Sequence, residues 1–338
     1  MRDALAKELV IQAKKNKDLI LLTGDLGYTV FEEFQTLYPK QFFNVGVAES
    51  NMIGIATGLA LSGKTVFCYS IANFVTLKTL EHVRNDTCVH NASVIIVGTG
   101  AGLSYSNGGP THHAVEDIAL MRTIPNLNIF SPADALEVAW TVKTSIKIKK
   151  PVYIRLGKKG EPLIHTKIPK LTFGKGNIIK NGKDFALIST GNLVYNSMEA
   201  EKILNKKGIS GTVVNLNTLK PIDKKLIISL SRKHKVIFTV EEHVLSGGLG
   251  SIIAEVLAPY STNNIHSLGI PNVFTFISGS QDYLREIYGL TPGKIARTIE
   301  KIIPEINVLV KYFNGQEWNT KNQILFFHKL FNSGFYEG

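Results

Sequence analysis

Short apolar segments rich in β-branched residues alternate with segments of helical length through the first half of the chain. The pattern predicts strands at 19–24, 42–46, 65–70, 93–98, 128–132 and 152–156, and helices at 3–16, 50–62, 76–90, 116–121 and 133–148. The strands are apolar on both faces, which is typical of a mostly parallel sheet covered by helices. The sequence therefore predicts an α/β fold.

The alternation lapses once, from Gly157 to Asp184, where Gly, Pro and Lys are frequent. A second series follows, with strands expected at 185–190, 211–217, 236–241 and 264–270 and helices between them. We expect a first domain at 1–160, a linker at 161–184, a smaller α/β domain at 185–304 and an aromatic tail at 305–338. The tail is short and broken by polar residues, so we expect it to pack on another chain rather than to anchor a membrane.

The composition is that of a soluble globular protein, with 44% hydrophobic and 19% charged residues in 338. The net charge of +11 comes from scattered Lys and Arg residues without an arginine-rich arm or zinc spacing. This disfavours nucleic-acid binding and suits an anionic small substrate or an acidic partner. Cys68 and Cys88 lie in no metal or redox spacing, and no apolar run could span a bilayer. We expect a cytoplasmic protein with no metal site of its own.

Polar, glycine-rich segments follow three of the predicted strands. They are "TGDLGY" after the first, "GVAES" after the second and "GTGAGLSYSNGGPTHH" after the fourth. Open parallel sheets bind their ligands at the carboxyl ends of the strands. The third segment carries five glycines, which let backbone approach a ligand closely, but it matches neither a Walker loop nor a dinucleotide fingerprint. These loops predict a ligand site at that edge.

Glu49 is the only acid in "FFNVGVAESNMIGIATGLAL", a stretch of otherwise apolar and small residues with few polar ones. A buried, unpaired carboxylate is costly and usually takes up a proton. Glu49 therefore either complements a helix N-terminus, with Ser50 as the cap, or is kept for chemistry.

Several long motifs, in order, resemble the transketolase family of thiamine-diphosphate enzymes. The segments "NVGVAESNMIGIATGLALSG", "SIANFVTLKTLEHVRN", "GGPTHHAVEDIALMRTIPNLNIFSPAD" and "PVYIRLG" resemble its pyrimidine-binding domain. The segments "VEEHVLSGGLGSIIAEVL" and "YGLTPGKIARTI" resemble its C-terminal domain, so the resemblance covers about residues 1–303. It implies a C-terminal domain that builds architecture and subunit contacts and has no site of its own.

The resemblance assigns four residues to the cofactor. Glu49 matches the catalytic glutamate that hydrogen-bonds a ring nitrogen of the aminopyrimidine and promotes formation of the ylid. Phe74 matches the aromatic that stacks on that ring, and Ile71 replaces a second aromatic, which leaves one wall aliphatic. Asp25 matches an acid of the first loop, although it could equally be an ordinary turn aspartate.

The substrate end of the pocket departs further from the family. His112 matches a histidine that moves protons at sugar oxygens, and Arg155 matches an arginine that grips a sugar phosphate, although it could equally be a structural ion pair. Gly108 stands where transketolases carry an aspartate, and Gly100 where a histidine often contacts phosphate. His113 replaces the usual glutamine and is assigned no role. The resemblance thus implies a sugar unlike the usual pentose phosphates.

The family holds the cofactor's diphosphate through Mg²⁺ with a "GDG" and a later "NN", on a separate domain. This chain has no "GDG", and its one "NN" is at 263–264, in the second domain. We therefore expect a split enzyme in which a diphosphate-binding partner subunit holds Mg²⁺ and thiamine diphosphate lies between the chains. The resemblance implies a heterotetramer with two copies of each chain.

The function that we expect is transfer of a two-carbon ketol unit from a ketose to an aldose. Three alternatives stay open: an enzyme like deoxyxylulose-phosphate synthase, the β subunit of a 2-oxo acid dehydrogenase, and a non-catalytic scaffold subunit. Release of CO₂ separates a 2-oxo acid donor from a ketol donor.

Overall fold

The computed structural model describes the backbone of residues 1–260 and 264–313 and the side chains up to residue 303. Residues 1–296 form one compact unit, and the described residues from Arg297 onward belong to a second. The aromatic tail expected at 305–338 lies outside the residues whose side chains are described. Of the helices in the described ranges, none is long and apolar enough to cross a membrane.

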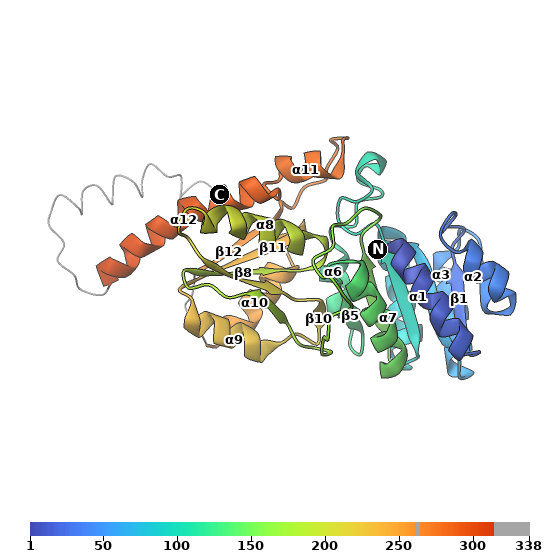
Figure 1. The fold of residues 1–338 in the computed structure, drawn as a ribbon. Helices are drawn as coiled ribbons and strands as arrows, with labels where there is room; N and C mark the ends of the chain where they lie inside the picture. The colour runs from blue at the N-terminus through green and yellow to red at the C-terminus, as the bar shows by residue number, and fades with distance from the viewer. Residues whose placement is uncertain (261–263, 314–338) are drawn as a thin grey trace. The chain divides into compact units, whose positions relative to one another are not determined.

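The first unit contains two sheets covered by helices (Figure 1). The seven-stranded sheet has the order β10-β5-β6-β4-β3-β1-β2. Its strands are β10 (Thr218–Lys220), β5 (Asn128–Phe130), β6 (Val152–Leu156), β4 (Val94–Thr99), β3 (Thr65–Ile71), β1 (Leu19–Thr23) and β2 (Phe42–Asn44). All neighbours pair in parallel except β10 with β5. Its helices are α1 (Arg2–Lys15), α2 (Glu32–Leu37), α3 (Glu49–Leu61), α4 (Ala72–Thr76), α5 (Leu80–His82), α6 (Asp117–Arg122) and α7 (Ala135–Ile148).

The five-stranded sheet has the order β12-β11-β8-β9-β7. Its strands are β12 (Asn264–Ile270), β11 (Val236–Val244), β8 (Phe185–Ser189), β9 (Gly211–Asn215) and β7 (Asn177–Lys180). Only β7 with β9 is antiparallel among these pairs. The helices that follow the linker are α8 (Val194–Asn205), α9 (Lys224–Lys233), α10 (Leu249–Leu257), α11 (Gln281–Ile287) and α12 (Pro292–Phe313). The predicted α/β fold class, with two mostly parallel sheets, is confirmed.

The structure differs from the predicted elements in four places. The helix expected at 76–90 is divided into α4, α5 and a π-helical turn at Val83–Cys88. Helix α2 was not expected. Strand β7 lies inside the expected linker 161–184, and β10 leaves the second series of elements to pair with β5 of the first sheet. The exact domain boundaries stay a prediction.

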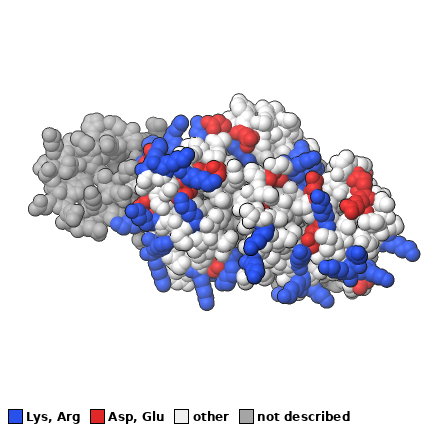
Figure 2. Space-filling view, in the orientation of Figure 1, with Lys and Arg blue, Asp and Glu red and all other residues white. Residues whose placement is uncertain are grey.

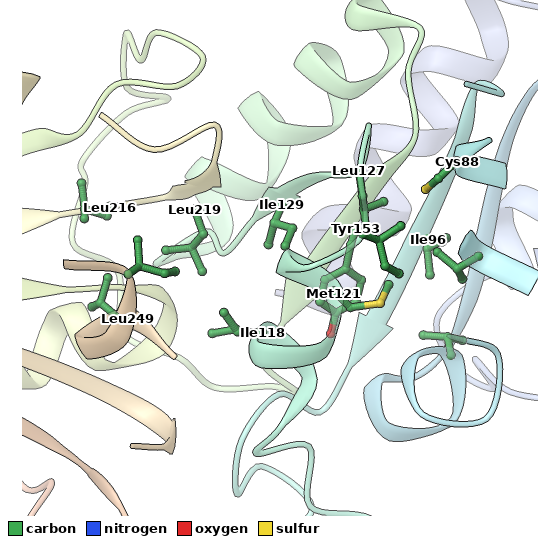
Figure 3. Packing of buried hydrophobic residues seen from close by; sticks show 14 of the residues in the cluster. Cys88, Ile96, Ile118, Met121, Leu127, Ile129, Tyr153, Leu216, Leu219 and Leu249 are labelled. Carbon is green, nitrogen blue, oxygen red and sulfur yellow. The ribbon is translucent and has the colours of Figure 1, made fainter. Parts of the chain in front are cut away.

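One hydrophobic core extends from the first sheet to the second (Figure 3). It joins buried residues of β4 and β6 to residues of β9, β10 and α10 by way of Ile118 and Met121 of α6. A second core packs α1 and α7 on the other face of the seven-stranded sheet. The two sheets are therefore held together by shared apolar packing.

Lysine and arginine side chains are spread over several elements on the face of the molecule that Figure 2 shows. This agrees with the scattered basic residues of the sequence.

Candidate active site

The predicted site residues lie in loops and helix starts that follow parallel strands of the first sheet. Because these strands run in the same direction, their carboxyl ends share one edge of the sheet. The residues at or after these strand ends are Asp25 after β1, Glu49 after β2, Ile71 at the end of β3, Phe74 in α4, and Gly100, Gly108 and His112 after β4. Arg155 lies within β6, and its side chain is engaged elsewhere.

Glu49 is the first residue of α3 and is 1% exposed. Its Oε1 accepts a hydrogen bond from Ser70 Oγ at 3.1 Å, and its Oε2 pairs with Lys78 Nζ at 2.8 Å. Burial raises the pKa of this carboxyl, but the hydrogen bonds from Lys78, backbone and Ser70 outweigh it, so the pKa is lowered. Glu49 is therefore buried but not unpaired, because the ammonium group of Lys78, in the turn after α4, reaches it.

The alternative in which Glu49 complements a helix N-terminus, with Ser50 as the cap, agrees with the structure in the position of Glu49 in the first turn of α3, but the Ser50 cap is wrong. The N-cap of α3 is Ala48, which makes no side-chain cap hydrogen bond, and Ser50 Oγ instead donates to the carbonyl of Lys78 at 3.4 Å. Glu49 is therefore ionised and held by side chains from β3 and the segment after α4.

Asp25 has a left-handed backbone with φ of 56°. Its Oδ1 accepts hydrogen bonds from Asn44 Nδ2 and from Tyr28 Oη, both at 2.9 Å. These bonds lower the pKa of Asp25, with the Asn44 bond as the larger cause. Asn44 also accepts from the backbone N–H groups of Asp25 and Gly46, so it ties the loop after β1 to the loop after β2. Asp25 is thus well held within a loop network, a role that fits an ordered turn and leaves cofactor contact as a prediction.

Phe74 and His112 lie next to each other, although they are 38 positions apart in the chain. Their ring centroids are 5.4 Å apart at 63°. Asn73 Nδ2 donates to the carbonyl of Thr111 at 2.8 Å, and Thr111 Oγ1 lies 2.9 Å from His112 Nδ1. Ile71, at the end of β3, is 7% exposed. The structure therefore brings the predicted aromatic and the predicted histidine together.

His113, the next residue along the chain, makes a different set of contacts. It is buried, its Nε2 lies 3.3 Å from the carbonyl of Ser106, and burial lowers its pKa.

Neighbouring side chains leave no room for a Cβ atom at either of the two glycines at the substrate end, Gly100 and Gly108. A Cβ on Gly100, whose φ is +81°, would lie 2.0 Å from the Tyr105 ring. A Cβ on Gly108 would lie 2.7 Å from Cβ of His112. Tyr105 and His112 therefore fill the space that larger side chains would need, and Lys158 Nζ lies 4.8 Å from the centroid of the Tyr105 ring.

Arg155 is 3% exposed and makes a structural ion pair rather than offering a free guanidinium. Its Nε lies 2.8 Å from Asp117 Oδ2 and 3.1 Å from Asp117 Oδ1. Its Nη2 donates to the carbonyls of Ala114 and Glu242, each at 3.0 Å. Of the two roles that the sequence left open, these contacts support the ion pair, because the groups that would grip a phosphate are used inside the protein.

Sequence reasoning missed the residues that hold the site: Ser70, Lys78, Asn44, Tyr105 and Lys158. The contact of Lys78 with Glu49 depends on how the turn after α4 lies against the start of α3. Ser70 and Asn44 depend on which strands are neighbours, and Tyr105 and Lys158 on the path of two loops. A local sequence pattern indicates neither which strands are neighbours nor which path a loop takes.

The described side chains contain no group of three or more His, Cys, Asp or Glu residues that could hold a metal ion.

Comparison with known families finds two matching models. The transketolase pyrimidine-binding domain matches residues 1–161, and the transketolase C-terminal domain matches residues 174–295. A putative transketolase C-terminal section of Methanocaldococcus jannaschii is 38% identical over 303 residues, covering 88% of this chain and 95% of the relative. An apulose-4-phosphate transketolase subunit of Phocaeicola vulgatus is 33% identical over 299 residues and covers 88% of this chain and 95% of that relative.

A solved structure described as a split-gene transketolase, an inactive β4 tetramer, superposes with a TM-score of 0.83 at 36% identity. The match covers 90% of this chain and 98% of that one. The family models account for most of the chain, and the relatives are separate chains of the same extent. This chain therefore belongs to the transketolase family and comprises its pyrimidine-binding and C-terminal domains.

Proposed function

We propose that this chain is the β-type subunit of a split, thiamine-diphosphate-dependent transketolase that moves a two-carbon ketol unit from a ketose to an aldose. The observation that carries the proposal is the shared edge of the first sheet, where the buried, ionised Glu49 and the Phe74–His112 pair both lie. A scaffold would have no need to keep a desolvated carboxylate there.

The residues at this edge fit an aminopyrimidine. Glu49 would share a proton with the ring nitrogen, donating the hydrogen bond when the carboxyl carries that proton and accepting it when the ring nitrogen does, and Phe74 and Ile71 would pack against the ring. Lys78 now occupies Oε2, so it would withdraw when the ring binds, and its half-exposed side chain can do so. When bound, thiamine diphosphate supplies stabilisation of the carbanion, and the protein supplies position and proton control.

His112 is the residue placed to act on the sugar. It is half-buried, its ring meets that of Phe74, and an imidazole can hold or release a proton near neutral pH. We assign it proton transfer at the sugar oxygens. Glu49 and His112 thus divide the work between the cofactor end and the substrate end.

The substrate end is built for an unusual sugar. Gly100 and Gly108 leave Tyr105 and His112 to shape it, and Arg155 is committed to Asp117. If the sugar is phosphorylated, the exposed Lys158 beside Tyr105 is the cation best placed to meet it. Its identity is left to a substrate panel.

We infer that the chain needs a partner, because the sequence lacks the "GDG" of the family's diphosphate site and the described side chains contain no group of three or more His, Cys, Asp or Glu residues that could hold a metal ion. We infer that a diphosphate-binding chain supplies that site and that two copies of each chain form a heterotetramer. The relative described as one subunit of a transketolase and the solved β4 tetramer described as inactive support this arrangement.

The test uses this chain co-expressed with its diphosphate-binding partner. Thiamine diphosphate with Mg²⁺ is titrated calorimetrically into the pair, and ketol transfer is followed with a panel of ketoses. We expect binding and turnover in the pair only, and turnover in Glu49→Gln to fall by about 10³-fold or more, since the acid acts on the reacting centre.

The matched control is Glu8→Gln. Glu8 is also a buried acid with a half-exposed lysine partner, Lys143 at 3.5 Å, but it lies on α1. It should keep full turnover. CO₂ release with 2-oxo acid donors in place of ketol transfer would establish the alternative enzyme, and a well-formed pair that binds no cofactor would establish the scaffold.

A further inference from the structure

The end of β11, in the C-terminal domain, contacts the glycine-rich loop that carries His112. Glu242 is 2% exposed, and its Oε1 accepts a hydrogen bond from the backbone N–H of Leu103 at 3.0 Å. The two residues are 139 positions apart in the chain. An acid of the second sheet therefore holds backbone of the loop after β4.

Two side chains of α11 hold Glu242 in turn. Arg285 donates to Oε2 from Nη2 at 2.6 Å and from Nε at 3.2 Å. Gln281 Nε2 donates to Oε1 at 2.8 Å and also lies 3.2 Å from Ser104 Oγ, in the same loop. Four groups thus direct N–H donors at one carboxylate, which has the acceptor sites to receive all of them.

The loop approaches Glu242 as closely as backbone can. Gly102 has φ of +62°, and a Cβ built on it would lie 2.6 Å from Cγ of Glu242 and 2.8 Å from its carbonyl oxygen. That same carbonyl accepts from Arg155, and the N–H of Val244 donates to the carbonyl of Val115 at 2.8 Å. The end of β11 is therefore hydrogen-bonded to the chain on both sides of His112, at Leu103 before it and at Val115 after it.

We propose that Glu242, supported by Arg285 and Gln281, is a positioning residue that holds the loop 100–113 so that His112 meets the substrate. The holding of the loop follows from the contacts alone, and its effect on turnover rests on the proposed function. The C-terminal domain, to which the sequence assigned no site, would then set the geometry of the substrate end.

The test is Glu242→Gln, a change of one atom. An amide has a single oxygen and an NH₂ that cannot accept, so the donors of Leu103 and Arg285 cannot both keep their acceptor. The matched control is Glu241→Gln. Glu241 is the neighbouring buried acid of β11, but it accepts from the backbone of Leu249 and Gly250 in α10.

The first readout is hydrogen exchange of loop amides in the chain alone, which needs no activity. We expect amides of 100–106 to exchange at least about tenfold faster in Glu242→Gln than in wild type, and no such change in Glu241→Gln. Gln281→Met, on the less buried partner, should give a smaller increase in the same place. Unchanged exchange in Glu242→Gln, or equal changes in both glutamine variants, would overturn the proposal.

The second readout is the kinetics of the complete pair. The kcat for ketol transfer should fall about tenfold or more in Glu242→Gln, while the Kd of thiamine diphosphate stays within about twofold, because Glu49 is not moved. An equal loss of cofactor binding would overturn a role confined to the substrate end. If the wild-type pair shows no transfer, the proposed function fails, and the exchange data still decide whether Glu242 holds the loop.

Discussion

Glu49 lies at the candidate site and Glu242 accepts a hydrogen bond from the loop that carries His112, and each is a nearly buried carboxylate paired with a basic side chain. Their partners differ. Lys78 beside Glu49 has a side chain that is 52% exposed, whereas Arg285 beside Glu242 is 10% exposed. Glu49 receives one further side-chain hydrogen bond, from Ser70, and Glu242 receives bonds from Gln281 and from the backbone of Leu103.

Because of this difference in exposure, the basic partner of Glu49 can leave, whereas the partners of Glu242 are fixed. A solvated lysine loses little when it swings into water, so a ligand can take its place. A buried guanidinium fork has fixed geometry and no solvent to return to. The cofactor end is therefore built for exchange of partners, and the end that supports the substrate loop is built to stay as it is.

The largest effect should come from breaking the fixed pair. Arg285→Met leaves Glu242 buried without its cation, and we expect the free energy of unfolding to fall by about 3–5 kcal/mol in urea denaturation at pH 7. The control is Arg122→Met, because Arg122 pairs with Glu255, whose side chain is 62% exposed, and should cost less than about 1 kcal/mol. Similar losses in both variants would contradict the contrast between fixed and solvated pairs.

Glu241 offers an intermediate case on the same strand as Glu242. Burial raises its pKa to about 7, because the backbone hydrogen bonds from Gly250 and Leu249 only partly compensate. His243 Nδ1 lies 3.9 Å away, but burial lowers the pKa of His243 to about 4, so it is neutral near pH 7.

A raised carboxyl pKa means that the folded state holds a proton that the unfolded state has released. The stabilising contribution of Glu241 is therefore complete below its ordinary pKa of 4.5 and is lost as the pH rises to about 7. We expect the stability of wild type to decline between pH 5 and 7, relative to Glu241→Gln, by on the order of 1 kcal/mol per pH unit. Parallel stability curves for the two proteins would show that Glu241 does not titrate in this range.

The sequence predicted the parts of the fold that depend on local pattern. The strands that become β1, β3, β4 and β6 are apolar runs, and their position before glycine-rich loops located the site edge. It did not predict β10, because three residues that cross back to pair with β5 carry no periodic signal. The break of the helix near 76–90 was missed for the same reason, since a π-helical turn has no distinct pattern over so few residues.

Within the site, the sequence motifs identified the candidate functional residues but not the side chains that surround them. Glu49, Phe74 and His112 were named from motifs, and the structure places the last two in ring contact. The partners were not predicted, because Lys78 on Glu49 and Asp117 on Arg155 depend on how helices lie on the sheet. Arg155 is an example. The sequence around an arginine at a strand end is the same whether its side chain faces a ligand or a buried aspartate, so the motif could not decide between the two roles.

The smallest effect on stability should come from the solvated pair, in Lys78→Met. Removing the lysine takes away the main bond that offsets burial, so the pKa of Glu49 should rise, as measured by ¹³C NMR of the labelled carboxyl during a pH titration. In wild type the lowered pKa stabilises the fold above the ordinary value of 4.5, and this contribution is lost as the pH falls through the folded pKa.

In Lys78→Met, the loss of stability that wild type shows as the pH falls through the pKa of Glu49 should be absent. At pH 7 the free energy of unfolding of this variant should be lower than that of wild type by less than about 1 kcal/mol. The exposed Lys147, on α7, gives the control Lys147→Met, which should leave the Glu49 titration unchanged. A Glu49 pKa that stays low in Lys78→Met would mean that Ser70 and the backbone alone hold the charge. Lys78 would then not be the partner that a ligand has to displace, and the distinction between the two acids would rest on Glu242 alone.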